Sequence, residues 1–166
     1  MQTRKLARGA LLVALALVLQ SLRLVLPLPL MLSTFIIGTL VHMMLVLTLK
    51  LNGLTTALLL GLLLPLTAYL QGQLALPFLV PVVWLGNVLF VLGVFVLTGR
   101  LRLATLLPPV IKGVVMLVGA WVVVFFLELP DGGLKRGILL GMSVPQVVTG
   151  VAGTFCAWRV LGRVRF

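Results

Sequence analysis

The stretch that decides the fold is Thr3–Pro27, TRKLARGALLVALALVLQSLRLVLP, in which a basic lead-in precedes a long apolar run. A helix needs about 20 apolar residues to cross a bilayer, and this run is long enough. Ala7, Ala10 and Ala14 recur at i, i+3 and i+7, so they share one helical face. Arg23 points nearly opposite these alanines at roughly 100° per residue. The run therefore predicts a membrane-spanning helix with one smooth face and one polar face.

Composition extends this prediction to the whole chain. Hydrophobic residues make up 62% of the 166 residues, and the mean hydropathy is +1.33. Both lie above what is typical of soluble domains. We expect an all-α membrane protein, a single domain over residues 1–166 that forms a six-helix bundle. A cleaved signal peptide is not expected, because the run 6–26 exceeds the length of a signal's apolar region. The lone Cys156 excludes an internal disulfide.

Six spans are expected, separated by proline, glycine and charge signals. They cover residues 6–26, 30–49, 53–70, 78–97, 109–127 and 137–160, with breaks at 27–29, 50–52, 71–77, 98–108 and 128–136. Pro65 and Pro145 fall inside spans, where each should bend its helix and free a backbone carbonyl that needs a partner.

The basic residues predict the topology. The formal net charge is +11, but the basic residues lie beside apolar spans and form no soluble basic domain. Membrane topology therefore accounts for the charge better than nucleic-acid binding does. With both termini cytoplasmic, ten of the thirteen basic residues lie inside: Arg4, Lys5, Arg8, Lys50, Arg100, Arg102, Lys112, Arg159, Arg163 and Arg165. The outer side keeps Arg23, Lys135 and Arg136 together with both acids, Glu128 and Asp131.

Lys112 would lie about one turn inside the cytoplasmic boundary, with its long side chain reaching the headgroups.

Neither acidic residue falls within an expected span. Proton-coupled carriers place a titrating carboxylate near the midplane, so this absence disfavours proton coupling. Sodium could still bind backbone carbonyls. If the protein moves a solute uphill, we expect a partner to supply the energy. The single histidine and single thiol provide neither a catalytic set nor a zinc site, so we expect no enzyme, no cofactor and no metal.

Neutral polar residues cluster near the centre and the outer half of the expected bundle. An aromatic ring with several amides suits a small heterocycle, because the ring stacks on its face and the amides bond its edge. The candidate substrate-binding residues are Gln20, Arg23, His42, Tyr69, Gln71, Trp84, Asn87, Gln146 and Thr149. Arg23 would attract a carboxylate or phosphate, so a neutral or anionic ligand is predicted. The alternative is that these side chains only bond one helix to another.

The pair Ala10-x-x-x-Ala14, in a first helix with a basic lead-in, resembles the substrate-binding S component of energy-coupling factor (ECF) vitamin transporters. The chain length, the six spans and the stretches PLTAYLQG, VWLGN and PQVVTG extend the resemblance. It implies that Ala10 and Ala14 dock on a coupling transmembrane subunit that works with two cytoplasmic ATPases. Ala7 shares their helical face, so we expect it to lie in the same docking surface. The chain would then capture a vitamin-like molecule outside a prokaryotic plasma membrane.

Two other classes remain open. One is a structural membrane protein of the cell-shape machinery, which would bind no ligand. The other is an autonomous small-solute transporter or channel, which would move its solute without an ATPase.

Overall fold

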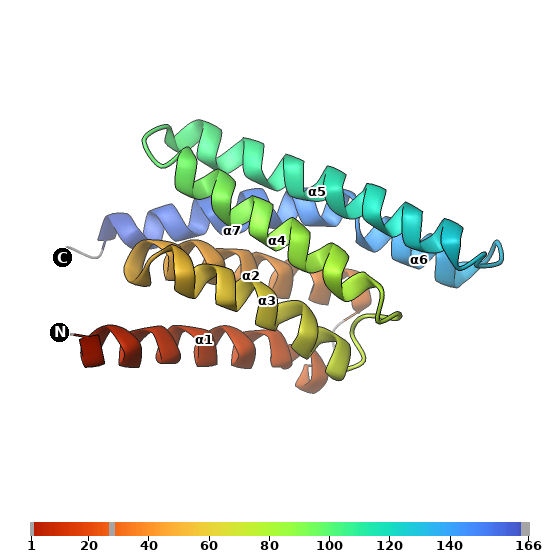
Figure 1. Cartoon of the computed structure of the whole chain (residues 1–166), viewed down its shortest axis with the longest axis horizontal. Helices are drawn as coiled ribbons and strands as arrows, with labels where there is room; N and C mark the ends of the chain where they lie inside the picture. Colours follow the sequence, from red (N-terminus) through yellow and green to blue (C-terminus); the bar gives the residue numbers. More distant parts are fainter. Residues whose placement is uncertain (1, 27–28, 164–166) are drawn as a thin grey trace.

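The computed structural model describes residues 2–26 and 29–163, a part of the chain that contains helices and no strand (Figure 1). The helices are α1 (Gln2–Val25), α2 (Leu30–Asn52), α3 (Leu54–Leu70), α4 (Leu79–Val96), α5 (Leu101–Phe126), α6 (Gly133–Gly141) and α7 (Val144–Arg163). Helix α1 begins and α7 ends at the same end of the molecule, which we call the terminal end. The α3–α4 and α5–α6 connections lie at the opposite, distal end (Figure 1).

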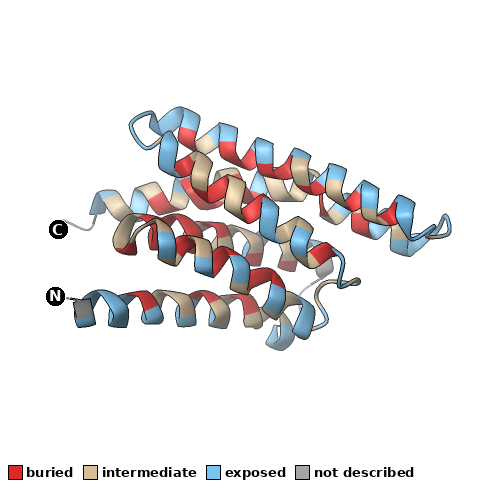
Figure 2. Cartoon of the chain, in the orientation of Figure 1, coloured by how far each residue is buried: buried red, intermediate tan, exposed pale blue. Residues whose placement is uncertain are grey.

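The helices have the length and composition of a multi-pass membrane bundle. In the described part of the chain, five segments are long and apolar enough to cross a bilayer: Thr3–Val25, Met31–Asn52, Leu79–Val96, Leu101–Phe126 and Gly133–Arg163. Helix α3 is also apolar and has 17 residues. Figure 2 shows exposed residues along the outward faces of the helices and buried ones between them. Which end faces the cytoplasm stays a prediction from the basic residues.

The first four expected spans coincide closely with α1 to α4, but the predicted break at 98–108 is too long, because the chain leaves the helix only over residues 97–100. Helix α5 begins at Leu101 and continues through Pro108 and Pro109. A proline ring cannot donate a backbone hydrogen bond, so two in a row suggested a helix boundary. The ring positions explain why the helix continues. A β-carbon on Gly93 would lie 3.0 Å from Pro108 Cβ, and one on Gly150 would lie 2.8 Å from Pro109 Cβ. Glycines on α4 and α7 therefore leave the space that the two rings fill.

The sixth expected span consists of two helices, α6 and α7, which are separated at Met142 and Ser143. Pro145 lies in the first turn of α7, where proline is tolerated. The helix therefore ends before Pro145 and a new one begins, whereas a bend in one continuous helix was expected. The freed carbonyl of Gly141 accepts a hydrogen bond from Gln146 Nε2 at 3.1 Å.

Helix α3 continues through Pro65 without a break. The carbonyl of Gly61, four residues earlier, cannot receive a helical bond from this proline. It accepts one from Asn87 Nδ2 at 2.9 Å instead. The prediction that each internal proline frees a carbonyl in need of a partner is thus confirmed at Pro65 and at Pro145 alike. Pro27, in the first predicted break, and Arg165 lie outside the described residues.

Two apolar clusters hold the bundle together. The larger joins α1, α2, α3, α4 and α7 and includes Met44, Leu45, Leu60 and Phe90. The smaller joins α4, α5 and α6 and its buried members are Leu79, Met116, Ala120, Val124, Ile138 and Met142. Every residue of α2 from Met44 to Leu49 is buried, so this helix runs through the centre of the bundle.

Candidate functional site

A cavity of about 490 Å³ lies at the distal end. This volume falls within the range of small-molecule sites. Its lining residues come from α1, α2, the α3–α4 connection, α4, α6 and α7: Arg23, Met31, Thr34, Gly38, Gln73, Leu74, Ala75, Leu79, Gly133, Leu134, Gly137, Ile138, Leu140, Gly141, Met142, Pro145, Gln146 and Thr149. A second hollow of about 390 Å³ at the terminal end is more open and is bordered by Lys5, Leu6, Asn52 and Thr56. The distal cavity is therefore the better candidate for enclosing a solute.

One wall of the cavity is a glycine face on α6. Gly133, Gly137 and Gly141 recur every fourth residue, so they lie on the same side of the helix. All three line the cavity, and a β-carbon built on any of them meets nothing within 4 Å. By contrast, a β-carbon on Gly38, also in the lining, would lie 3.0 Å from the side chain of Thr149. The α6 glycines, of which Gly133 and Gly137 are exposed, therefore border open space where they line the cavity.

Arg23 supplies the charge of the cavity wall. Its Nε donates to Ser33 Oγ and its Nη2 donates to Thr34 Oγ1, each at 3.2 Å. Both acceptors are neutral hydroxyls on α2, and the side chain is half-buried. No carboxylate belongs to the wall among the residues that the structure describes.

Helix α7 contributes two further candidate residues, Gln146 and Thr149. Gln146 Nε2 donates to the carbonyl of Gly141, as described above. Thr149 Oγ1 donates to the carbonyl of Pro145 at 2.7 Å. Both side chains thus lie at the cavity just after the break between α6 and α7, and each donates a hydrogen bond to a backbone carbonyl.

The α3–α4 connection closes another side of the cavity through two glutamines. Gln73 lines the cavity, and its Nε2 donates to Gln71 Oε1 at 2.6 Å. Gln71 in turn donates from Nε2 to Ser21 Oγ at 2.7 Å. Gln71 therefore lies behind the wall and fastens the connection to α1.

A buried polar cluster lies one helical turn from the cavity, in the middle of the bundle. Lys112 Nζ contacts His42 Nε2 at 2.8 Å and donates to Asn87 Oδ1 at 2.7 Å. His42 Nδ1 lies 2.7 Å from the carbonyl of Gly38, a cavity residue, which assigns the ring proton to Nδ1. Asn87 Nδ2 donates to the carbonyl of Gly61. Two backbone carbonyls therefore orient both partners of the lysine.

The position expected for Lys112 is wrong. Because α5 begins at Leu101, Lys112 lies about 16 Å along the helix. Its side chain is 2% exposed and cannot reach headgroups. An ionisable residue inside an apolar span is a functional candidate by default. The presence of a lysine in an apolar span could have identified Lys112 as a candidate. Because Pro108 and Pro109 were interpreted as the start of the helix, Lys112 was expected at the membrane surface.

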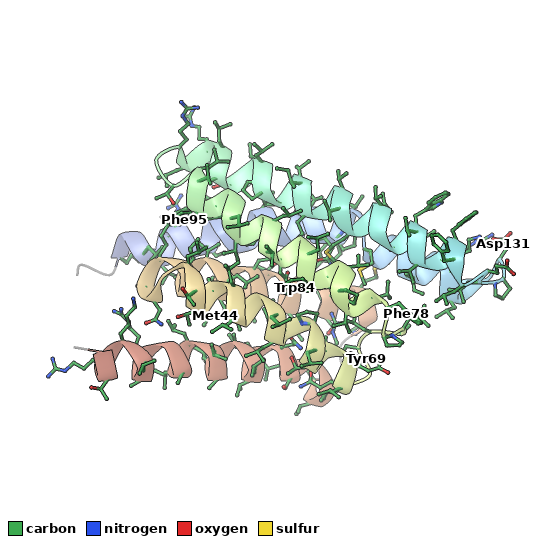
Figure 3. All side chains as sticks on the ribbon, viewed as in Figure 1. Met44, Tyr69, Phe78, Trp84, Phe95 and Asp131 are labelled. Carbon is green, nitrogen blue, oxygen red and sulfur yellow. The ribbon has the colours of Figure 1, made fainter. Side chains whose placement is uncertain are left out.

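The remaining candidates lie away from the cavity. Trp84 is 39% exposed on α4, three residues from the buried Asn87, and does not line the cavity (Figure 3). Tyr69 is 37% exposed at the distal end of α3. Gln20 is buried and donates to the carbonyl of Leu64 and to Thr67 Oγ1. Arg23, Gln146 and Thr149 are thus the three candidates that the structure brings together at one cavity, while His42 and Asn87 meet at Lys112.

The three alanines of α1 lie on its exposed face. Ala7, Ala10 and Ala14 are all exposed, whereas Gly9 and Ala16 are buried against the bundle. A β-carbon on Gly9 would approach Asn52 Nδ2 to 2.4 Å, so α1 packs closely through its other side. The small-residue face remains uncovered in the single chain.

Within residues 2–26 and 29–163, no group of three or more His, Cys, Asp or Glu side chains could hold a metal ion. Comparison of the chain with family models, with curated proteins and with solved structures found no match.

Proposed function

We propose that the protein is the substrate-capture subunit of an importer, similar to the S component of ECF-type ABC importers, and binds a vitamin-like molecule in the distal cavity. The observation that carries the proposal is the cavity with its glycine wall. Protein interiors are close-packed, so a purely structural bundle would gain stability by filling this volume. Gly133 and Gly137 are exposed, and a β-carbon on any of the three α6 glycines would meet nothing within 4 Å, so packing within the chain gives them no role. A bound solute gives them one.

The basic residues favour uptake from outside. If the terminal end faces the cytoplasm, as the excess of Lys and Arg there favours, the distal cavity faces outward. Its lining contains Arg23, Gln146 and Thr149 within a largely apolar wall. Such a wall suits a small neutral or anionic solute.

The exposed face of α1 supports a partner that supplies energy. Ala7, Ala10 and Ala14 are exposed, and small side chains allow close approach of another helix in lipid. Both acidic residues, Glu128 and Asp131, fall in the α5–α6 connection, so no described helix carries a carboxylate. We assign the energy source to a coupling transmembrane subunit and two cytoplasmic ATPases, and the location to a prokaryotic plasma membrane.

The test is reconstitution in liposomes with and without an ECF coupling module. The protein alone should bind solute without concentrating it, and accumulation should require the module and ATP. Ala14→Trp should abolish assembly while ligand affinity stays intact, because the bulky ring blocks the face that no other helix of the chain covers. Val118→Trp is the matched control, since Val118 is exposed on α5. Normal assembly of Ala14→Trp, or accumulation by the protein alone, would contradict the proposal.

A further inference from the structure

We infer that the solute is an organic anion whose carboxylate or phosphate group pairs with Arg23 in the cavity wall. The inference rests on the proposed capture function and adds the charge class of the ligand. It is carried by three observations: the hydrogen bonds that Arg23 makes, those that the other polar wall residues make, and the distribution of acids.

Arg23 has donors to spare. A guanidinium carries five N–H groups, and hydrogen bonds to Ser33 and Thr34 engage two of them. Three remain without an acceptor among the described residues. The two hydroxyls hold the planar group against α2, so its orientation is set before a ligand arrives. A planar group with parallel free N–H bonds matches the two oxygens of a carboxylate or phosphate.

The other polar side chains of the wall have already engaged donors. Gln146 Nε2 donates to a backbone carbonyl, and Thr149 Oγ1 does the same. Gln73 Nε2 donates to Gln71. Each glutamine nitrogen keeps one further N–H, whereas Arg23 keeps three and is cationic, so Arg23 holds the larger share of the donors that these side chains can offer to a ligand.

No carboxylate lines the cavity in the part of the chain that the structure describes. Asp131 lies at the distal tip of the molecule, 87% exposed, and pairs with Lys135 at 2.7 Å (Figure 3). Glu128 is exposed in the same connection and does not line the cavity. Lys112, below Gly38, is held by two neutral side chains. A cationic ligand would find no carboxylate among the described lining residues and would face Arg23, whereas an anion would gain charge-assisted hydrogen bonds.

An anionic group could come from a water-soluble acid or from a lipid headgroup. We therefore test matched pairs of soluble acids and neutral analogues in uncharged detergent: nicotinate and nicotinamide, pantothenate and pantothenol, biotin and biotin amide. Thiamine serves as the cationic probe. A parallel arm compares nanodiscs of phosphatidylcholine with and without phosphatidylglycerol. Thermal unfolding reports binding in every arm, because a ligand that binds only the folded state raises Tm.

At least one acid should raise Tm, and its neutral analogue should bind about tenfold more weakly or worse. Arg23→Gln should remove this difference, and Arg23→Lys should keep part of it. The matched control is Arg136→Gln, which removes an exposed charge on α6 that does not line the cavity. If Arg23→Gln lowers the Tm of the free protein, the acid preference of Arg23→Lys still decides the question.

Equal binding of an acid and its neutral analogue, unchanged in Arg23→Gln, would overturn the charge assignment and leave solute capture standing. Stronger binding of thiamine than of any acid would likewise overturn the charge assignment and leave solute capture standing. Stabilisation by phosphatidylglycerol that requires Arg23, with no soluble acid acting, would support the anion site and overturn solute capture. If no compound and no lipid stabilises the protein, both conclusions fall.

Discussion

Lys112 and Arg23 are two basic side chains held by neutral partners in opposite surroundings. Lys112 is 2% exposed, and both its partners are anchored on backbone carbonyls in the middle of the bundle. Arg23 borders a cavity of about 490 Å³ and keeps three free N–H groups. The comparison teaches that neutral acceptors hold a basic side chain at both sites, and that access to open volume separates the two sites. We expect substitutions of Lys112 to change mainly the stability of the protein, and substitutions of Arg23 to change mainly ligand binding.

The largest effect is expected for Lys112→Ala. It leaves His42 Nε2 and Asn87 Oδ1 without a donor in the interior and removes the packing of the lysine stem. We expect the free energy of unfolding to fall by about 2–4 kcal/mol, measured by denaturant titration in mixed micelles. Lys112→Met keeps the stem and should cost less. Arg23→Gln should cost less than Lys112→Ala, and the reverse order would break the comparison.

The next effect is expected for Gly153→Ala, at the crossing of α7 and α2. A β-carbon there would lie 2.5 Å from the carbonyl oxygen of Thr39, 2.7 Å from His42 Cβ and 2.8 Å from the backbone nitrogen of Met43. Two of these atoms belong to the backbone, so the helices must separate, at a cost of about 1–3 kcal/mol. Gly162→Ala, later in α7, is the control because its β-carbon meets nothing within 4 Å. Equal stability of the two variants would show that the crossing is looser than described.

Gly137→Ala, at the cavity wall, is expected to raise the stability of the protein, whereas the two preceding variants lower it. Its β-carbon meets nothing within 4 Å, and alanine favours a helix over glycine. We expect the ligand-free protein to gain about 0.5–1 kcal/mol in the same titration. A loss of stability would indicate that the glycine face packs against another part of the chain and does not border open volume.

The smallest effect is expected at the exposed distal tip, for Asp131→Asn. The hydrogen bond from Lys135 and its positive charge lower the pKa of the Asp131 carboxyl below its ordinary value. A lowered pKa contributes stability above the ordinary pKa and loses it as the pH falls through the folded-state value. The small Tm difference between wild type and Asp131→Asn should therefore be present at neutral pH and vanish in acid. A difference that persists in acid would assign it to another cause.

Sequence patterns predicted the helices well where the signal is local. An apolar run with a basic lead-in is sufficient for α1, and the same kind of signal places α2 to α4. The start of α5 was missed because it depends on where Pro108 and Pro109 pack. Their rings fit against Gly93 and Gly150, which lie far away in the sequence.

The candidate site was predictable only in part, for the same reason. Arg23, Gln146 and Thr149 were identified from residue type and expected depth, and all three line one cavity. Trp84 was expected beside them, but it is 39% exposed on α4 and does not line the cavity. The every-fourth spacing of Gly133, Gly137 and Gly141 was visible in the sequence. The role of these glycines could not be predicted, because small residues at this spacing usually allow helices to pack closely. Only the structure places open volume beside them.

The most direct test of the account is whether the distal cavity holds a small molecule. Protein purified from its native membranes would be denatured, and released compounds identified by mass spectrometry. We predict that Gly137→Leu, which fills the cavity, loses a compound that wild type and Gly162→Leu both retain. Both glycines are helical, and a β-carbon on either meets nothing within 4 Å. Gly137 lines the distal cavity and Gly162 does not, so only the first variant changes the cavity. Retention of the same compound by Gly137→Leu, or its absence from wild type, would contradict the account.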